Sequence, residues 1–386
     1  MGLVFSQQKV MAADEGNGQS MTIYGIYLGS AAQGDATLVE SEGEYLLMDV
    51  GQYESYSYVK KFLNARGVKK LSVYISHLHS DHTGGYTEGK GFEQLCRDFE
   101  VEKLYLPSQS LFADKIALNA FLERYDGLAG FFTKYGGSEN DICYLKVGDT
   151  FTFGDVTVNV IGPVGTDSMN NADFLSGDEK TAYEKASSGA SSSGKEETED
   201  DGLEADYDDI TDDGSEAELE LEEDTLDDPD SEDVEIGYLT ITNAYINNLS
   251  LISQLVCGDV TFLTTGDTRK EEEELLVKAY GKALKCDILK VAHHGTASSS
   301  TKEFMACAQP AYSYIQNSGV AGVRWKTNNG LTWRKTYKAR RNAAEYGIVY
   351  LVGNEKYDIA YKVSDGEIGM YTSKDGFSEK LRSEER

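Results

Sequence analysis

The histidines of this 386-residue chain lie in two short clusters, and the first cluster has the composition of a metal site. In the sequence ISHLHSDHTGG, His77, His79, Asp81 and His82 fall within six residues, directly after the apolar run LSVYIS. Such a run predicts a strand that ends in a loop. In this loop His77 and His79 can face one cation, while Asp81 and His82 turn toward a second. Imidazole and carboxylate ligands favour zinc, iron or manganese.

The other candidate ligands also follow apolar runs. The sequence LSLISQLVCGDVTFLTTGD predicts two strands joined by a tight turn, and it places Asp267 at the end of the second strand. A charged, helix-like stretch at about residues 269–285 leads to the strand CDILKVA and then to His293 and His294. One histidine of this pair is expected to be a metal ligand, and the other is expected to contact either a ligand side chain or the substrate. Three strand ends therefore carry all the candidate ligands.

The elements that must position these side chains alternate along the chain. Strands are predicted for TIYGIYL, ATLVES, EYLLMDV, LSVYIS and KLYLPS, with helical patterns at 53–66 and 111–135. After the second histidine cluster, helices at 301–308 and 334–346 alternate with the strands AYSYIQ, GIVYLVG and YDIAYKV. This order predicts an α/β fold in which two mixed sheets pack face to face with helices outside, a four-layer αββα sandwich.

An acidic segment divides this predicted domain. Residues 186–236 hold 23 acidic residues and one lysine, which accounts for most of the formal net charge of −30. Like-charge repulsion and few apolar residues predict a disordered insertion. The predicted organisation is therefore a leader or linker at 1–21, a domain in two parts at 22–185 and 237–375 around the insertion at 186–236, and a charged tail at 376–386.

Cysteine use and hydropathy exclude other classes of protein. Five cysteines without Cys-x-x-Cys spacing argue against a disulfide scaffold or a structural zinc knot. The sequence has no run of 18 or more apolar residues, so it predicts no transmembrane helix. The first twenty residues have a short apolar start followed by small residues, which favours a secreted or cell-surface location, with a cytoplasmic location as the alternative.

The order of these motifs resembles the metallo-β-lactamase fold superfamily, and within it the hydrolase domain of the ComEC-type competence DNA channel. The resemblance extends over about residues 22 to 365 and implies a free-standing hydrolase domain with the αββα sandwich. The His-rich loop is highly specific for the superfamily, whereas the remaining motifs are individually weak. These are Gln33-Gly34-Asp35-Ala36, Met48-Asp49-Val50-Gly51, Asn247-Asn248-Leu249-Ser250-Leu251, Thr265-Gly266-Asp267 and Leu289-Lys290-Val291-Ala292-His293-His294-Gly295.

The resemblance implies a hydrolase with two divalent metal ions, zinc or alternatively manganese. Many members of the superfamily have a further histidine between the first loop and the bridging aspartate, but this chain has Asn247 and Asn248 in that region. An amide is a poorer ligand for zinc, so one ion is expected to bind more weakly, and a single-metal enzyme is the alternative. The implied ligands are His77, His79, Asp81, His82, Asp267 as the bridge, and His293 or His294, with Asp81, Asp267 and His294 as catalytic residues.

The implied substrate is a phosphodiester, either a small molecule or an oligomer. Asp49 is expected to orient a ligand loop, and Asn248, Thr296 and Ser298 are expected to contact ligands or phosphate oxygens. The negative charge argues against a processive nuclease, because it repels polyanions, so nucleic acid is a weaker candidate. Two alternatives stay open: a lactone or β-lactam hydrolase, and a metal-binding interaction module without turnover.

Overall fold

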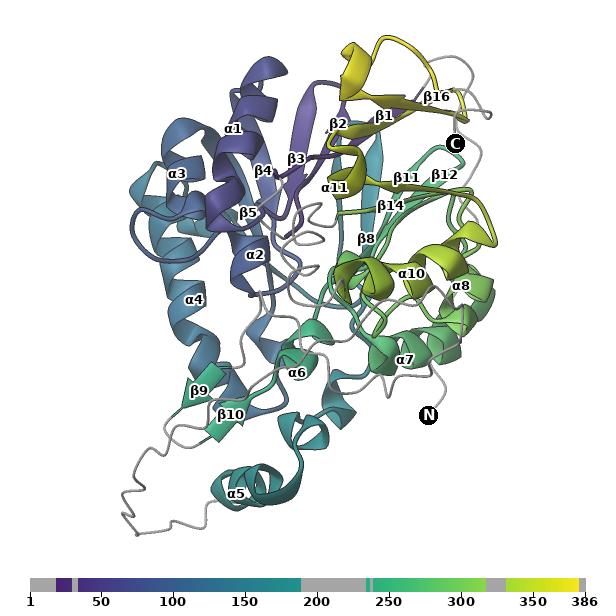
Figure 1. Cartoon of the computed structure of the whole chain (residues 1–386). Coiled ribbons are helices and arrows are strands. Elements are labelled where there is room, and N and C mark those ends of the chain that lie inside the picture. Colours follow the sequence, from purple (N-terminus) through teal and green to yellow (C-terminus); the bar gives the residue numbers. More distant parts are fainter. Residues whose placement is uncertain (1–18, 30–33, 189–233, 237–238, 317–330, 382–386) are drawn as a thin grey trace, which may run out of the picture.

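Two mixed β-sheets form the centre of the computed structural model, which describes residues 19–29, 34–188, 234–236, 239–316 and 331–381 (Figure 1). The first sheet has eight strands in the order β17-β16-β1-β2-β3-β4-β5-β6. Strands β17 to β3 are antiparallel, and β3 to β6 are parallel. Their bounds are β1 Ser20–Gly25, β2 Thr37–Ser41, β3 Glu44–Met48, β4 Lys70–Tyr74, β5 Glu100–Pro107, β6 Ile142–Leu145, β16 Ile359–Ser364 and β17 Glu367–Thr372.

The second sheet has seven strands in the order β15-β14-β13-β12-β11-β8-β7. Strands β15 to β12 are parallel, and β12 to β7 are antiparallel. Both predicted parts of the domain contribute strands to both sheets. The bounds are β7 Thr150–Phe153, β8 Val156–Gly162, β11 Ile252–Cys257, β12 Val260–Thr264, β13 Ile288–Lys290, β14 Tyr312–Ile315 and β15 Ile348–Leu351.

Alternating side chains of the strands build separate apolar cores. On β3, Leu46 and Met48 enter the core between the two sheets, while Leu47 enters the core beneath the helices of the first sheet. This alternation follows from the two-residue period of a strand. Phe262 and Tyr314 meet the same inner core from the second sheet. The sheets therefore pack face to face.

Helices cover the outer face of each sheet. Helix α4 begins at Asp114, whose carboxylate caps two backbone N–H groups, and it buries Phe121, Tyr125, Leu128 and Phe132 at helical spacing. Together these layers confirm the predicted αββα sandwich. Over the first sheet lie α1 Tyr56–Ala65, α3 Gly91–Asp98 and α4 Lys115–Lys134; over the second lie α7 Lys270–Tyr280, α8 Lys302–Ala308 and α10 Leu331–Ala344.

Short elements connect these layers, and several of them border the strand ends. Among them, the one-turn helix α2 follows β4, and η8 follows β13. Their bounds are α2 Ser80–Thr83, α5 Gly177–Ser187, α6 Asn243–Asn247, α11 Val352–Glu355, η1 Tyr53–Ser55, η2 Gln109–Leu111, η3 Glu139–Asp141, η4 Thr166–Ser168, η5 Asn171–Phe174, η7 Gly281–Leu284, η8 His293–Gly295 and η9 Ser373–Asp375, with the hairpin β9 Val234–Ile236 and β10 Leu239–Ile241.

Several of the predicted segments lie partly or mostly outside the residues that the structure describes. Helix α5, which the sequence analysis did not predict, extends to Ser187 and so crosses the predicted start of the insertion at 186. Residues 1–18 of the predicted leader, 189–233 of the insertion, Gln33 and the last five residues of the tail lie outside the described residues. Among the residues described, no helix is long and apolar enough to cross a bilayer.

Candidate metal centre

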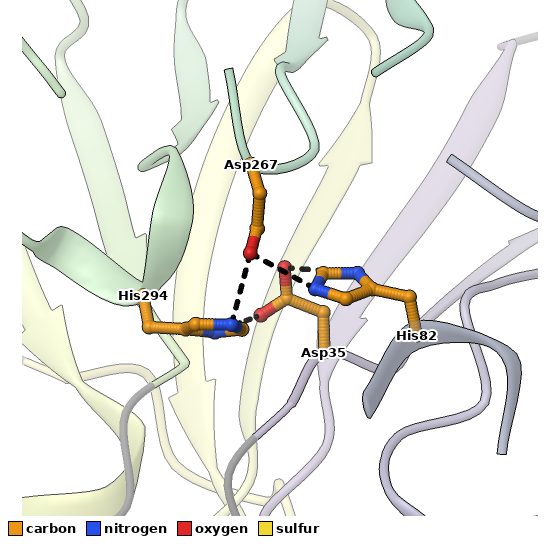
Figure 2. Close-up of side chains that lie close together, drawn as sticks. All are labelled: Asp35, His82, Asp267 and His294. Atoms are coloured by element: carbon orange, nitrogen blue, oxygen red, sulfur yellow. Dashed lines mark hydrogen bonds and ion pairs between the residues drawn. The ribbon is translucent and has the colours of Figure 1, made fainter. Parts of the chain in front are cut away.

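The predicted ligands meet where strands β4, β12 and β13 end. His82 lies in α2, Asp267 lies just after β12, and His294 lies in η8. Asp35, just before β2, joins them from the other side. Figure 2 shows these four side chains pointing toward one another, and their ligand atoms all lie within 4.8 Å of one another. All four are buried.

Two imidazoles and two carboxylates converge most closely. His82 Nε2 and His294 Nε2 each lie 3.1 Å from Asp267 Oδ2. Asp81 Oδ2 lies 3.2 Å from His294 Nε2 and 3.7 Å from His82 Nε2. Two imidazole nitrogens and two carboxylate oxygens in one buried space are a donor set that zinc and related dications accept.

A second carboxylate stands behind each of these imidazoles. His82 Nδ1 lies 2.8 Å from Asp49 Oδ2, and His294 Nδ1 lies 3.1 Å from Asp35 Oδ1. Asp49 is fixed in turn by the backbone N–H and the hydroxyl of Ser76, each at 2.7 Å. A carboxylate on Nδ1 holds the proton there and leaves Nε2 as the ligand atom. Asp49, predicted from the sequence to orient a ligand-bearing loop, thus contacts both His82 and Ser76 in the structure.

His77 and His79 lie beside this cluster but contact each other. His77 Nε2 is 3.0 Å from His79 Nδ1, and the ring centroids of His77 and His82 are 4.1 Å apart. The loop between the pair is held by Arg124, which donates to the carbonyl of Leu78 at 2.6 Å. Burial lowers the pKa of His77 well below its usual range, and neighbouring His82 and His79 lower it further. Burial lowers the pKa of His79 to about 4, so both imidazoles are neutral.

The converging imidazoles have the opposite electrostatics. Burial opposes the protonated form of both His82 and His294, but the carboxylates around them outweigh burial. The pKa of His82, next to Asp267 and Asp81, is therefore raised well above its usual range, and Asp267 and Asp35 do the same to the pKa of His294. Burial would raise the pKa of Asp267, but His294 and His82 hold it well below its usual range. The carboxylates thus dominate the electrostatic potential of the cluster, and their negative charge attracts a dication.

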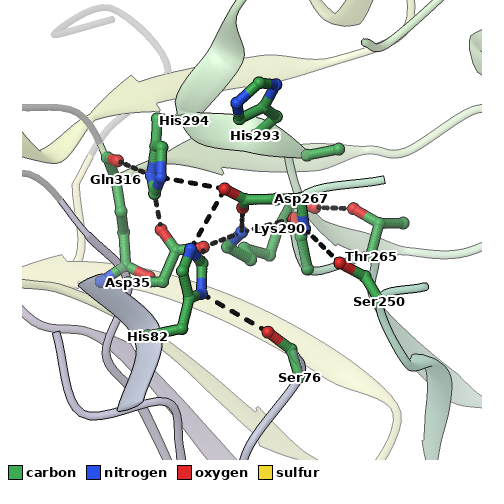
Figure 3. A network of polar contacts seen from close by, with 12 residues as sticks. Asp35, Ser76, His82, Ser250, Thr265, Asp267, Lys290, His293, His294 and Gln316 are labelled. Atoms are coloured by element: carbon green, nitrogen blue, oxygen red, sulfur yellow. Dashed lines mark hydrogen bonds and ion pairs between the residues drawn. The ribbon is translucent and has the colours of Figure 1, made fainter. Parts of the chain in front are cut away.

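The two histidines of η8 point in different directions, although they are adjacent. Figure 3 shows His293 apart from His294. His293 Nδ1 lies 2.8 Å from Thr296 Oγ1 and 3.0 Å from Ser298 Oγ, and its Nε2 lies 3.3 Å from Asn247 Nδ2. Only His294 therefore joins the Asp81–Asp267 cluster. The φ angles of His293 and His294 are 47° and 51°, a strained region for side chains of this kind that is retained mainly at functional sites.

Asn248 is held by the start of helix α7, away from the converging ligands. Its amide donates to Glu271 at 3.1 Å, and its carbonyl accepts from the backbone N–H of Arg269 at 3.1 Å. Its neighbour Asn247 is the asparagine that faces a histidine, His293. Asn248 therefore positions the turn after Asp267, whereas Asn247 contacts His293, one of the predicted site residues.

Asp35, Lys290 and Gln316 belong to the centre but were given no role in the sequence analysis. Lys290 pairs with Asp35 beneath the ligands, and the backbone carbonyl oxygen of Gln316 lies 3.2 Å from His294 Nδ1. One signal was visible in the sequence: a lysine inside the apolar strand CDILKVA must be buried and so requires a partner. No comparable signal distinguished Gln316 from an ordinary strand residue.

The residues present fit a metal ion. Within the described part of the chain, His79 Nε2 and Asp81 Oδ1 are buried without a hydrogen-bond partner. Leaving a buried polar atom unpaired costs about 1–3 kcal/mol, which a bound cation would offset. Asp81, His82, Asp267 and His294 would hold this ion. The prediction of two ions assigns a second, weaker ion to His77 and His79. Nitrogen and oxygen donors suit zinc, manganese or iron.

Comparisons with known proteins give short sequence matches and distant structural ones. No family model matches the chain. ComE operon protein 3 of Bacillus subtilis (strain 168) is 36% identical over 69 residues, and competence protein ComA of Neisseria gonorrhoeae is 36% identical over 77 residues. These segments are 18% and 20% of this chain, but only 9% and 11% of those proteins.

Two of the similar solved structures cover most of the chain. The metallo-β-lactamase fold protein YhfI from Bacillus subtilis aligns with 89% of this chain and 100% of its own, with 11% identity and a TM-score of 0.42. CmlA, a diiron β-hydroxylase from Streptomyces venezuelae, aligns with 89% of this chain and 54% of its own, with 9% identity and a TM-score of 0.43. With the observed layers and motifs, the chain has the αββα architecture of the metallo-β-lactamase fold and resembles ComEC-type competence proteins over short segments.

Proposed function

We propose that this protein is a metal-dependent hydrolase that cleaves a phosphodiester. The observation that carries the proposal is the convergence of His82 Nε2 and His294 Nε2 on Asp267 Oδ2, at 3.1 Å each, with Asp81 beside them. Such a buried group of unlike charges has no evident structural purpose, because apolar side chains would fill the same space at lower cost. A site that binds a dication explains all four residues together.

Each residue has a definable task in this chemistry. When bound, a divalent metal ion lowers the pKa of a water ligand to about 7 and so supplies hydroxide at neutral pH. Asp49 and Asp35 keep the protons of His82 and His294 on Nδ1, so that both Nε2 atoms remain available as ligands. Asp267, with its pKa held well below its usual range, stays an anion and remains the central ligand. Burial of the cluster excludes bulk water from these groups.

The proposed substrate class is supported by the surroundings of the centre and by the resemblance. The hydroxyls of Thr296 and Ser298, beside His293, are donors of the kind that contact phosphate oxygens. The resemblance to the ComEC-type hydrolase domain implies a phosphodiester, and short segments of the chain are similar to two competence proteins. The net charge of −30 repels long polyanions, so a small phosphodiester or an oligonucleotide end is the proposed substrate rather than an extended nucleic acid.

Hydrolysis of three model substrates tests the proposal. Protein loaded with Zn²⁺ or Mn²⁺ is expected to cleave bis-p-nitrophenyl phosphate and to lose this activity with a chelator. Cleavage of nitrocefin or of a lactone, without the phosphodiester, would instead identify one of the alternative hydrolases. Binding of metal with turnover of none of the three would favour the interaction module.

A matched pair of variants separates loss of the centre from a general loss of charge. Asp267 and Asp259 lie at opposite ends of the β11–β12 hairpin, and Asp259 is exposed. Asp267→Asn is expected to abolish phosphodiester cleavage, whereas Asp259→Asn should retain the wild-type rate. Equal activity of the two variants would overturn the proposed role of Asp267.

A further inference from the structure

Lys290 is a buried cation beneath the proposed metal centre. It lies on β13, in the parallel part of the second sheet, with a side chain that is 3% exposed. Figure 3 shows its ammonium group between Asp35 and Asp267. It forms an ion pair with Asp35, donates to the carbonyl of Gly266 at 3.0 Å, and lies 3.8 Å from Asp267 Oδ1. Its contacts thus reach both sides of the ligand cluster.

These contacts join two parts of the centre that otherwise meet through the imidazoles of His82 and His294. Asp35, on the loop before β2, holds His294 Nδ1 through its other oxygen. Gly266, whose φ of 50° places it in the left-handed region, forms the turn that carries Asp267. A Cβ on this glycine would lie 2.7 Å from the Ser250 side chain, so the turn has little room to move.

A buried ammonium is strongly disfavoured unless it is paired and hydrogen-bonded. Apolar residues surround Lys290 on its own strand, and a leucine or methionine there would pack at a lower desolvation cost. Retaining a lysine therefore indicates that its charge and three donors serve the site rather than the sheet. Its neighbours along the strand, Leu289 and Val291, face the outer core of the second sheet, so Lys290 shares its face of the strand with Ile288 of the core between the sheets.

We propose that Lys290 is a positioning residue that orients the metal ligands: through Asp35 it fixes His294, and through the Gly266 carbonyl it fixes the turn that presents Asp267. The inference rests on the proposed metal centre. It has a clear rival, because a positive charge next to a cation site also repels the cation. Positioning requires that metal binding weakens when Lys290 is removed, whereas simple repulsion requires that it strengthens.

The test is metal affinity, measured by competition of the full-length protein with a chromophoric chelator for Zn²⁺ and for Mn²⁺. Lys290→Met is expected to raise the dissociation constant about 10- to 100-fold, the usual effect of removing a partner of a metal ligand. The control is Lys285→Met, which changes the net charge equally but alters an exposed lysine just before the same strand. This control should bind as the wild type does.

A double variant keeps the test informative if Lys290→Met does not fold. Asp35→Asn combined with Lys290→Met leaves neither buried charge unpaired, and it is expected to bind at least about 10-fold more weakly than the wild type. If Lys290 acts through Asp35, the loss in the double variant is also smaller than the product of the two single losses. Losses that multiply would show that the two residues act independently.

A spectroscopic readout separates positioning from general damage, since the chain has only five histidines. In the zinc-loaded wild type, hydrogen-bonded Nδ1 protons of His82 and His294 should both be visible in the downfield proton spectrum. Lys290→Met should lose the His294 signal and retain that of His82, which Asp49 holds separately. Unchanged or tighter binding by Lys290→Met would overturn the proposal, whereas a wild type that binds no dication would overturn the metal centre itself.

Discussion

The carboxylate of Asp49 lies 2.8 Å from Nδ1 of His82, and the other ring nitrogen of His82 faces Asp267. Asp49 directly follows strand β3 and has a φ of 60°, a conformation that costs a non-glycine residue energy. Burial raises the pKa of Asp49, although His82 and the N–H of Ser76 oppose this rise. The residue is thus held in a strained, buried position in order to meet one imidazole nitrogen.

Replacing this carboxylate by an amide should weaken metal binding. In Asp49→Asn the side chain can present its N–H₂ group to His82 Nδ1, which would favour the wrong tautomer and direct a proton toward the metal. We expect a 10- to 100-fold loss of zinc affinity, measured by calorimetric titration. The exposed Asp126→Asn on α4 is the control and should bind normally. Wild-type affinity in Asp49→Asn would show that His82 needs no partner.

Arg124 should matter more for one ion than for the other. Its guanidinium packs 4.2 Å from the Phe121 ring centroid and donates to the Leu78 carbonyl between His77 and His79. Arg124→Gln removes this support, so the weaker ion should lose affinity by about tenfold while the tighter ion is retained. Stepwise zinc titration measures both. Arg97→Gln, at an exposed site on α3, is the control, and an equal loss at both sites would contradict the separation of the two sites.

A buried glutamate on α7 should make stability depend on pH. Glu273 accepts the backbone N–H groups of Ser300 and Thr301 at 2.6 Å and 2.8 Å, and burial raises its pKa to about 7. Because the folded pKa exceeds the unfolded value, its contribution is fully present below pH of about 4.5 and is lost as pH rises through about 7. A shift of this size corresponds to on the order of 3 kcal/mol.

Urea unfolding between pH 5 and pH 8, with chelator present, measures this effect. Glu273→Gln should flatten the pH dependence of the unfolding free energy over this range relative to the wild type. Glu274→Gln, which alters the exposed neighbour, should leave the wild-type slope. Glu272, whose pKa burial also raises to about 7, and the buried histidines of the centre also contribute in this range, so the slope should fall but not vanish. An identical slope in Glu273→Gln would refute this interpretation.

The fold was predictable because its apolar patterns are local and strong. The run LSVYIS gave β4, and the helical pattern at 53–66 gave η1 and α1. The pattern at 111–135 gave α4, whose start at Lys115 is set by the capping carboxylate of Asp114 rather than by the apolar spacing. Helix α5 was missed because it buries only Tyr183, and a helix held by one buried side chain has almost no periodic signal.

The residue pattern indicated the centre most directly where candidate ligands follow one another in sequence, whereas Asp267 was predicted from the end of an apolar strand and from the resemblance. The spacing of His77, His79, Asp81 and His82 indicated metal, since these residues share one loop. Which histidine of the second pair points inward depends on the left-handed backbone at η8, and no residue pattern specifies that conformation at two successive histidines. The role of Asp35 was hidden because its partner His294 lies 259 residues away along the chain.

Metal binding should release protons, because the apo centre and the metal-bound centre need different protonation states. The carboxylates around His82 and His294 raise the pKa of each well above its usual range, so both imidazoles are protonated at pH 7 without a cation. A cation can bind Nε2 only after that proton has left, so zinc binding at pH 7 should release about two protons per chain.

Calorimetric titration in buffers of equal pH but different ionisation enthalpy measures this number as a slope. His82→Asn should reduce the release by about one proton, while an exposed change such as Lys285→Met should not. Release close to zero would mean that the imidazoles and carboxylates of the centre carry no displaceable protons before the ion arrives, and would contradict the prediction.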